Sequence, residues 1–263
     1  MVAKVKSYFY LFGLLLKVDL FILLRIIVGK MINILFWSSS IVVVATYIFP
    51  KLGMTETFGQ FMVVSSIVAG AWWGMWDSTY MFMKDLEGDN EISYKLALPL
   101  PSWLIILQYA IKHAMVRFLP SLIVLPFFKI MLGSRMDLSQ FSFFQFLLMF
   151  VTICLFTGFF FVCVASFVRS TDTVDNVGIR LLFPMWFFGA TQYSWSIMHS
   201  INPTIGYFTL LNPLVYAMEG IHSAVLGSQA YISFWSCAVA LWGFIILFGF
   251  IGIVRLKKRL DFV

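Results

Sequence analysis

Six stretches of about twenty apolar residues follow one another along the chain, with polar segments between them. A helix of about 20 mostly apolar residues is long enough to cross the hydrocarbon core of a bilayer. Since 61% of the residues are hydrophobic and only 11% are charged, the chain has too little polar surface to cover a water-facing exterior. The sequence therefore predicts an all-α integral membrane protein with one domain. The six predicted spans within residues 1–263 are 31–49, 61–82, 103–128, 144–168, 177–197 and 231–254.

The stretch before the first predicted span is apolar, but Lys17 and Asp19 lie near its centre. Each charge costs about 2.5–3.5 kcal/mol at the middle of a bilayer. A helix lying in the membrane interface avoids most of this cost, because Lys17 and Arg25 can extend to the headgroups. We therefore expect an interfacial helix over 4–28. The alternative is a seventh span, which would place the N-terminus on the opposite side of the membrane.

The distribution of Lys and Arg predicts the orientation, because cytoplasmic segments of membrane proteins are enriched in these residues. With both termini placed inside, the inner segments carry twelve Lys and Arg and the outer segments carry three. The inner segments are 1–30, 83–102, 169–176 and 255–263, and the outer segments are 50–60, 129–143 and 198–230. We expect a multi-pass protein of the cytoplasmic membrane with both termini in the cytoplasm. The net charge of +6 is explained by these inner segments, so no nucleic-acid partner is expected.

Sequence motifs for catalysis are absent. The chain contains no G-x-x-x-x-G-K-[ST] phosphate loop, no H-E-x-x-H zinc motif and no G-x-S-x-G nucleophile elbow. The three histidines are scattered, and the three cysteines lie inside apolar runs without metal-site spacing. The sequence therefore predicts a protein that is not an enzyme and that holds no metal or cofactor of its own.

The densest charge in the chain lies between the second and third predicted spans. Asp89 or Asn90 can cap a short helix, and Glu91 then lies near the positive end of its dipole. Ile92 and Leu96 are four residues apart and therefore share one helix face. This pattern predicts a short cytoplasmic helix with one apolar edge, and the alternative is an ordinary charged loop. The predicted helix lies within 85–98, and its candidate contact residues are Glu87, Asp89, Glu91, Ile92 and Leu96.

The region after the fifth predicted span is apolar but interrupted by Pro203 and Pro213. Glu219 is its only acidic residue. Such a segment is too apolar for an ordinary external loop and too broken for one straight helix. Non-helical backbone at membrane depth is tolerated where protein or a water-filled cavity surrounds it. We expect short helices that re-enter the outer leaflet, forming a hairpin over 198–227.

Ionisable residues within membrane segments are default candidates for a functional role. Anchoring at the interface, ion pairing or local hydrogen bonding is the alternative for each of them. A tryptophan cluster in the second predicted span adds an aromatic candidate beside the small residues Gly70 and Gly74. The candidate residues for a translocation path are Trp73, Asp77, Arg117, Arg180 and Glu219.

The whole pattern resembles the ABC-2 type permeases, which are the transmembrane subunits of ABC exporters. The resemblance rests on the interfacial helix, the six spans, the stretch Gly88-Asp-Asn-Glu-Ile ending in Leu98-Pro99, and the late Asn212-Pro-Leu-Val-Tyr216-x-x-Glu219. It implies that two permease chains, identical or related, pair in the bilayer. It also implies that two separate ABC ATPase subunits bind ATP and Mg²⁺ and dock against 85–98. The implied substrate is amphipathic or lipid-linked, such as a glycan, a lipid or a drug.

Two other classes of protein remain open from the residues alone. A stand-alone secondary carrier or channel is the first, although carriers usually show broken helices in both halves of the chain. Here the breaks concentrate in the second half, around Pro184, Pro203 and Pro213. A membrane-embedded transferase is the second, and the lack of a convergent polar cluster counts against it.

Overall fold

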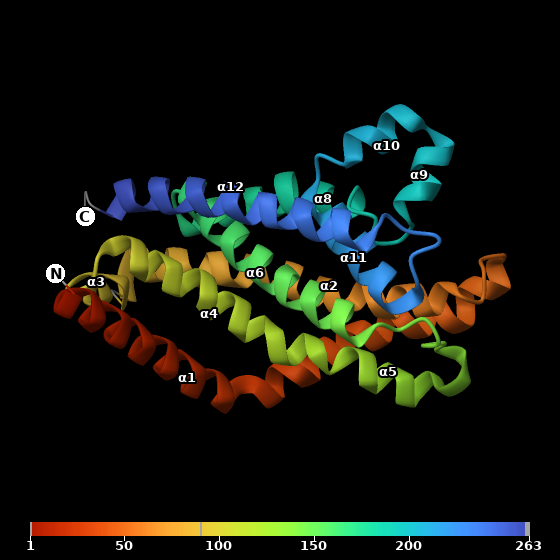
Figure 1. Ribbon diagram of the computed structural model, residues 1–263, viewed down its shortest axis with the longest axis horizontal. Coiled ribbons are helices and arrows are strands. Elements are labelled where there is room, and N and C mark those ends of the chain that lie inside the picture. The colour runs from red at the N-terminus through yellow and green to blue at the C-terminus, as the bar shows by residue number, and fades with distance from the viewer. Residues whose placement is uncertain (1, 90, 261–263) are drawn as a thin grey trace.

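The computed structural model describes residues 2–89 and 91–260, with side chains from residue 6 onward except that of Asp89. This part of the chain is helical, and it contains no strand. Figure 1 shows the long helices packed side by side in an elongated bundle. These helices are α1 (Val2–Val43), α2 (Phe58–Lys84), α4 (Ser102–Leu122), α6 (Phe143–Phe167) and α12 (Phe234–Leu260).

Short helices connect the long ones. The α-helical pieces are α3 (Glu91–Leu96), α5 (Val124–Leu132), α7 (Val174–Val177), α8 (Phe183–Phe187), α9 (Trp195–Ile201), α10 (Pro203–Thr209) and α11 (Pro213–Leu226). The π-helical turns are η1 (Val44–Ile48), η3 (Asp85–Asp89) and η6 (Gly178–Leu182). The 3₁₀ turns are η2 (Phe49–Leu52), η4 (Gly133–Arg135) and η5 (Thr171–Thr173).

Within the described residues, four helical segments are long and apolar enough to cross a membrane. They are Phe58–Gly88, Ser102–Arg135, Phe143–Phe167 and Phe234–Leu260. Together with the absence of strands from the described chain, they confirm the predicted all-α membrane protein.

Helix α6 forms the centre of the bundle, between α4 and α12. Two glycines let these helices approach closely. A Cβ on Gly158 would lie 2.3 Å from the carbonyl oxygen of Ala110 on α4. A Cβ on Gly252 of α12 would lie 2.8 Å from the backbone nitrogen of Cys163 on α6. Small residues at such crossings bring backbones into contact, which is how helices pack without a hydrophobic driving force between them.

The predicted boundary between the helix over 4–28 and the span over 31–49 is wrong. The separate helices expected over 4–28 and 31–49 are one uninterrupted helix, α1, which bends along its course (Figure 1). The cost of the Asp19 charge had favoured the separation. In the structure Asp19 is buried, its carboxylate lies 3.3 Å from Nζ of Lys112, and Gln108 donates to it. Asp19 is thus paired with α4, and helix α1 continues past it. The interfacial position of 4–28 stays a prediction.

The fifth predicted span, 177–197, is not a single helix. Helical backbone runs from Thr171 to Phe187 through η5, α7, η6 and α8, and a turn follows in which Ala190 has a φ of 58°. The π-helical turn η6 precedes Pro184, which cannot donate a backbone hydrogen bond to the residue four positions earlier. The missing donor accounts for the irregular winding at this point.

The region 198–227 breaks at the two prolines that the sequence indicates. Asn202 and Asn212 cap α10 and α11, their side-chain oxygens accepting from Ile205 N at 3.2 Å and Leu214 N at 3.0 Å. Helices α9 and α10 project from the bundle in Figure 1, whereas α11 is buried against α6 and α12. The depth of this hairpin in the outer leaflet stays a prediction.

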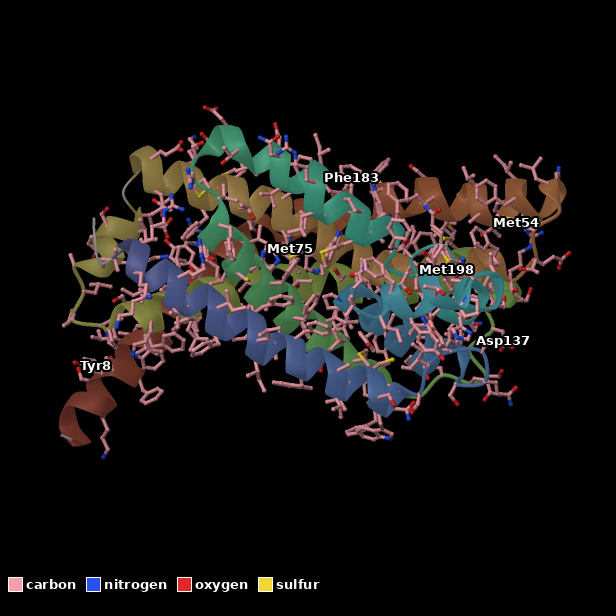
Figure 2. All side chains as sticks on the ribbon, turned by 90° about the horizontal axis from the view of Figure 1, so that it is seen from above. Tyr8, Met54, Met75, Asp137, Phe183 and Met198 are labelled. Atoms are coloured by element: carbon pink, nitrogen blue, oxygen red, sulfur yellow. The ribbon has the colours of Figure 1, made fainter. Side chains whose placement is uncertain are left out.

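The two ends of the bundle differ in what they carry. Figure 1 shows α3 and both marked ends of the chain at one end, and α9 and α5 toward the other. Figure 2 likewise shows Tyr8 at one end and Met54, Asp137 and Met198 toward the opposite end. The inner and outer segments predicted from the basic residues therefore lie at opposite ends of the molecule.

Candidate functional site

A polar cavity of about 490 Å³ lies between α1, α2 and α4. Its charged residues are Lys30, Asp77 and Arg117, one from each helix. The full lining is Lys30, Asn33, Ile34, Trp37, Ala69, Gly70, Trp73, Gly74, Trp76, Asp77, Arg117, Pro120 and Ser121. The cavity thus combines ionisable groups with three tryptophan side chains in a membrane bundle.

Arg117 reaches the cavity because position 74 has no side chain. Its Nη2 donates to the carbonyl of Gly74 at 2.8 Å. A Cβ at Gly74 would lie 1.9 Å from the guanidinium carbon, so any other residue would displace the arginine. Nε of Arg117 and Oγ of Ser121 are buried without a hydrogen-bond partner among the described residues. The site therefore holds unused donors.

The charges of the cavity do not neutralise one another by contact. Within the part of the chain that the structure describes, neither Lys30 nor Arg117 forms an ion pair with Asp77. Two cations and one carboxylate leave a formal charge of +1. Asp77 is exposed at the rim, whereas Lys30 and Arg117 are partly buried.

A second, mainly apolar cavity of about 810 Å³ adjoins the first. The two cavities share Trp37, Ala69 and Trp73 in their linings, so they lie side by side, and together they are here called the α1–α2 groove. Helix α8 forms the far wall, where the Trp73 ring lies 4.8 Å from that of Phe183. Phe183 is labelled in Figure 2. Along α1 the groove runs from Lys30 to Ile41, which is about 17 Å at 1.5 Å per residue. This length is about half of the hydrocarbon core.

Three of the five predicted path residues meet in this groove, namely Trp73, Asp77 and Arg117. Arg180 does not, because it is exposed on η6. Glu219 is buried on α11, and its two carboxylate oxygens accept from Trp195 N at 2.6 Å and Ile232 N at 2.9 Å. Its contacts in the structure are therefore local hydrogen bonds, which were the alternative to a role in a translocation path.

The residues that α1 contributes to the groove are not among the candidates predicted from the sequence. Lys30, Asn33, Ile34 and Trp37 are spaced at three and four residues, which places them on one helix face. This spacing is the signal that could have found them. The expected helix boundary at 28–31 separates Lys30 from the predicted span and so hides this spacing.

At the end of the bundle that carries the chain ends, Asp85 fixes the short helix α3. Its carboxylate accepts from Glu91 N at 2.6 Å, from Ile92 N at 3.0 Å and from the Tyr109 hydroxyl at 3.2 Å. The cap was expected from Asp89 or Asn90. The side chain of Asp89 and the whole of Asn90 lie outside the described residues.

The prediction that Ile92 lies on a free apolar edge is wrong. Its side chain is only 3% exposed and packs into the chain's own core, and Leu96 is half-buried against the same core. The cap from Asp85 turns this face of α3 toward α4, where burial of apolar side chains stabilises it. The outward face instead carries Tyr94, which is 70% exposed, and Glu91.

A charged network joins α3 to the bundle. Lys95 Nζ lies 2.6 Å from Glu91 and 4.4 Å from the centre of the Tyr109 ring. Lys112 Nζ lies between two carboxylates, at 3.6 Å from Glu91 and 3.3 Å from Asp19. Partial burial by itself raises the pKa of Glu91, but Lys95 and Lys112 outweigh it and hold that pKa below its ordinary value.

Glu87, the remaining candidate of this segment, contacts a different connection. Its carboxylate accepts from the backbone N of Thr171 at 2.8 Å and from the Thr171 hydroxyl at 2.7 Å. It thereby joins η3 to the turn η5 that follows α6. Glu87 therefore stabilises a loop–loop contact beside α3.

A family model described as ABC-2 type transporter matches residues 12–226. The match includes most of α1 and all of α2, the two helices after which the groove is named. It also includes α3 and α11. No curated protein matches the chain.

Proposed function

The chain belongs to the ABC-2 type transporter family, and on this premise we propose that it is the permease of an ATP-driven exporter. As a family member it is a multi-pass membrane component of an ABC transporter and associates with ABC ATPase subunits. The proposed cargo is an amphipathic or lipid-linked molecule, moved outward across the cytoplasmic membrane. The family match carries this proposal, and the α1–α2 groove supports it with a path that is charged at one end and apolar at the other.

The proposed energy source is a pair of separate ATPase subunits that bind ATP and Mg²⁺. The permease sequence contains no phosphate loop, so the work must come from a partner. Two permease chains, identical or related, would stand above the two ATPases. A partner can shift the permease between states only through contacts that differ between those states.

Helix α3 is the proposed contact with the ATPase. It presents Tyr94 outward, Asp85 joins its start to Tyr109 of α4, and Glu91 joins it through Lys112 of α4 to Asp19 of α1. A displacement of α3 would therefore act on both α1, which lines the groove, and α4, which contributes Arg117 to it.

The isolated chain is expected to hydrolyse no ATP, because it lacks a phosphate loop. Hydrolysis is expected when the chain is purified together with its ATPase partner. The measurement is phosphate release by the chain alone, the ATPase alone and the complex, with a phosphate-loop lysine variant of the ATPase as control. Hydrolysis by the chain alone, at a rate that survives further purification, would exclude this energy source.

Small tags are expected to place the ends of the chain inside the cell. Tags at residues 1 and 263 should react with an impermeant reagent only after permeabilisation, because the basic segments stay on the cytoplasmic side. A tag beside Ser134 should react in intact cells, since η4 lies toward the opposite end of the bundle. Labelling of the N-terminal tag in intact cells would contradict the proposed orientation.

A further inference from the structure

Resting on the proposed export function, we propose that the α1–α2 groove binds an amphiphile whose headgroup carries an anionic phosphate. The phosphate would lie between Lys30 and Arg117 in the polar cavity, and the apolar part of the molecule would extend into the adjoining cavity. This assigns a chemical class to the substrate and a position to each of its two parts.

The first support is the state of Arg117. Its guanidinium is held by a single contact to Gly74, and its Nε is buried with no partner among the described residues. An unpaired buried cation is costly, and a bound anion removes that cost. The planar guanidinium presents its donors in a fork that matches the oxygens of a phosphate. Ser121, one helical turn along α4, adds a second buried polar atom without a partner among the described residues, its hydroxyl oxygen.

The second support is the placement of the charges. Lys30 approaches the same cavity from α1, so a ligand there meets cations on two walls. The carboxylate of Asp77 is on α2 at the exposed rim and makes no ion pair with either cation in the described chain. The net charge of the lining favours an anion, and Asp77 weakens that preference without cancelling it.

The third support concerns the kind of anion. A site for free phosphate needs only the polar cavity. Here Trp37, Ala69 and Trp73 line both cavities, and the adjoining 810 Å³ is walled by residues such as Met62, Phe183 and Trp186. An apolar space adjoining a cationic one matches a molecule with both an apolar and an anionic part. We therefore assign the groove to an amphiphile and not to inorganic phosphate.

The test is binding of dioctanoyl phosphatidic acid to the full chain in detergent, measured by native mass spectrometry and by calorimetry. Arg117→Gln and Lys30→Gln should each weaken binding by about tenfold or more, since each removes a charge-assisted contact. Asp77→Asn should strengthen binding by about threefold, because it removes a nearby negative charge. The matched control is Arg25→Gln, an exposed cation on α1 outside the groove, which should leave binding unchanged.

Two further probes identify which part of the ligand the groove recognises, the phosphate or the acyl chains. Dioctanoylglycerol has the same acyl chains without the phosphate, and its affinity should be lower by about tenfold or more. Inorganic phosphate at millimolar concentration should not displace the phosphatidic acid. Equal binding of the two lipids, or equal weakening by Arg25→Gln, would overturn the headgroup assignment. Displacement by inorganic phosphate would overturn the assignment of the groove to an amphiphile.

The same variants separate this inference from the proposed function. If Arg117→Gln lowers the amount of folded protein, Lys30→Gln and Asp77→Asn, which alter partly exposed side chains, decide the question. Retention of the ATPase is measured on each variant, and we expect it to be unchanged. Loss of lipid binding with the ATPase retained supports the inference. A chain that binds the lipid as expected but never retains an ATPase would contradict the export function and leave the binding site standing.

Discussion

Replacing Tyr94 with aspartate is expected to abolish transport and to release the ATPase, while the permease still folds and inserts. Tyr94 is the large apolar side chain on the outward face of α3, and it is 70% exposed in the isolated chain. Tyrosine is among the residues that dominate interface energies, where truncation often costs about 2 kcal/mol or more. That loss corresponds to about thirtyfold in affinity. A buried aspartate without a partner would weaken the contact further.

The measurement is pull-down of the ATPase by each variant, with membrane expression and transport assayed in parallel. Tyr94→Phe is the matched control, because it keeps the ring and removes only the hydroxyl, and it should retain the ATPase. Ile92→Asp is expected to behave differently, lowering the amount of folded permease, since Ile92 lies in the chain's own core. Normal ATPase retention and transport by Tyr94→Asp would show that the outward face of α3 is not the docking surface.

Replacing Gly158 with leucine is expected to remove most of the folded protein. The Cβ alone would lie 2.3 Å from the carbonyl oxygen of Ala110, and a backbone atom cannot move aside as a flexible side chain can. Overpacking in a core costs about 1–3 kcal/mol, and more where the backbone must shift. Against a total stability of about 5–15 kcal/mol, separation of α4 from α6 would leave little native bundle.

The check is the yield of monodisperse protein by size-exclusion chromatography, together with its thermal transition. Gly243→Leu is the control, because a Cβ at that glycine of α12 meets nothing within 4 Å and the position is exposed. It should leave yield and transition unchanged. Gly158→Ala should fall between the two. Equal yields from Gly158→Leu and Gly243→Leu would mean that the close crossing of α4 and α6 does not limit stability.

Hydrophobic run lengths sufficed to predict an all-helical membrane protein, because spanning a bilayer leaves few backbone alternatives. They failed where a tertiary contact decides the outcome. The charge of Asp19 indicated an interfacial helix separate from the first span. In the structure Asp19 pairs with Lys112, 93 positions later in the chain, and the two predicted helices are one. The turn after Phe187, in which Ala190 has a φ of 58°, likewise divides a segment that hydropathy alone predicts to be one span.

The groove shows the same limit for the candidate site. Trp73, Asp77 and Arg117 could be selected individually, since intramembrane charges and clustered aromatics stand out in a sequence. Their convergence could not be predicted, because it depends on how α2 and α4 are rotated toward each other. Gly74 is decisive for this convergence, because the lack of a side chain at this position leaves room for the arginine between the two helices. On α3, helical spacing grouped Ile92 with Leu96 correctly but did not reveal that their shared face turns inward.

The hydrogen bonds of Glu219 and Asn212 have a consequence for how this protein can change over evolution. Glu219 accepts from Trp195 N where α9 begins, and Asn212 Nδ2 donates to the Met185 carbonyl at 2.6 Å just after α10 ends. Trp195 meanwhile donates to Gly206 at 2.8 Å, so α9 and α10 are also joined to each other. The projecting pair is thus closed at its base and packed on itself. Insertions, deletions or an exchanged hairpin between residues 196 and 208 would alter the outer surface while the packing of the helices beneath stays as it is.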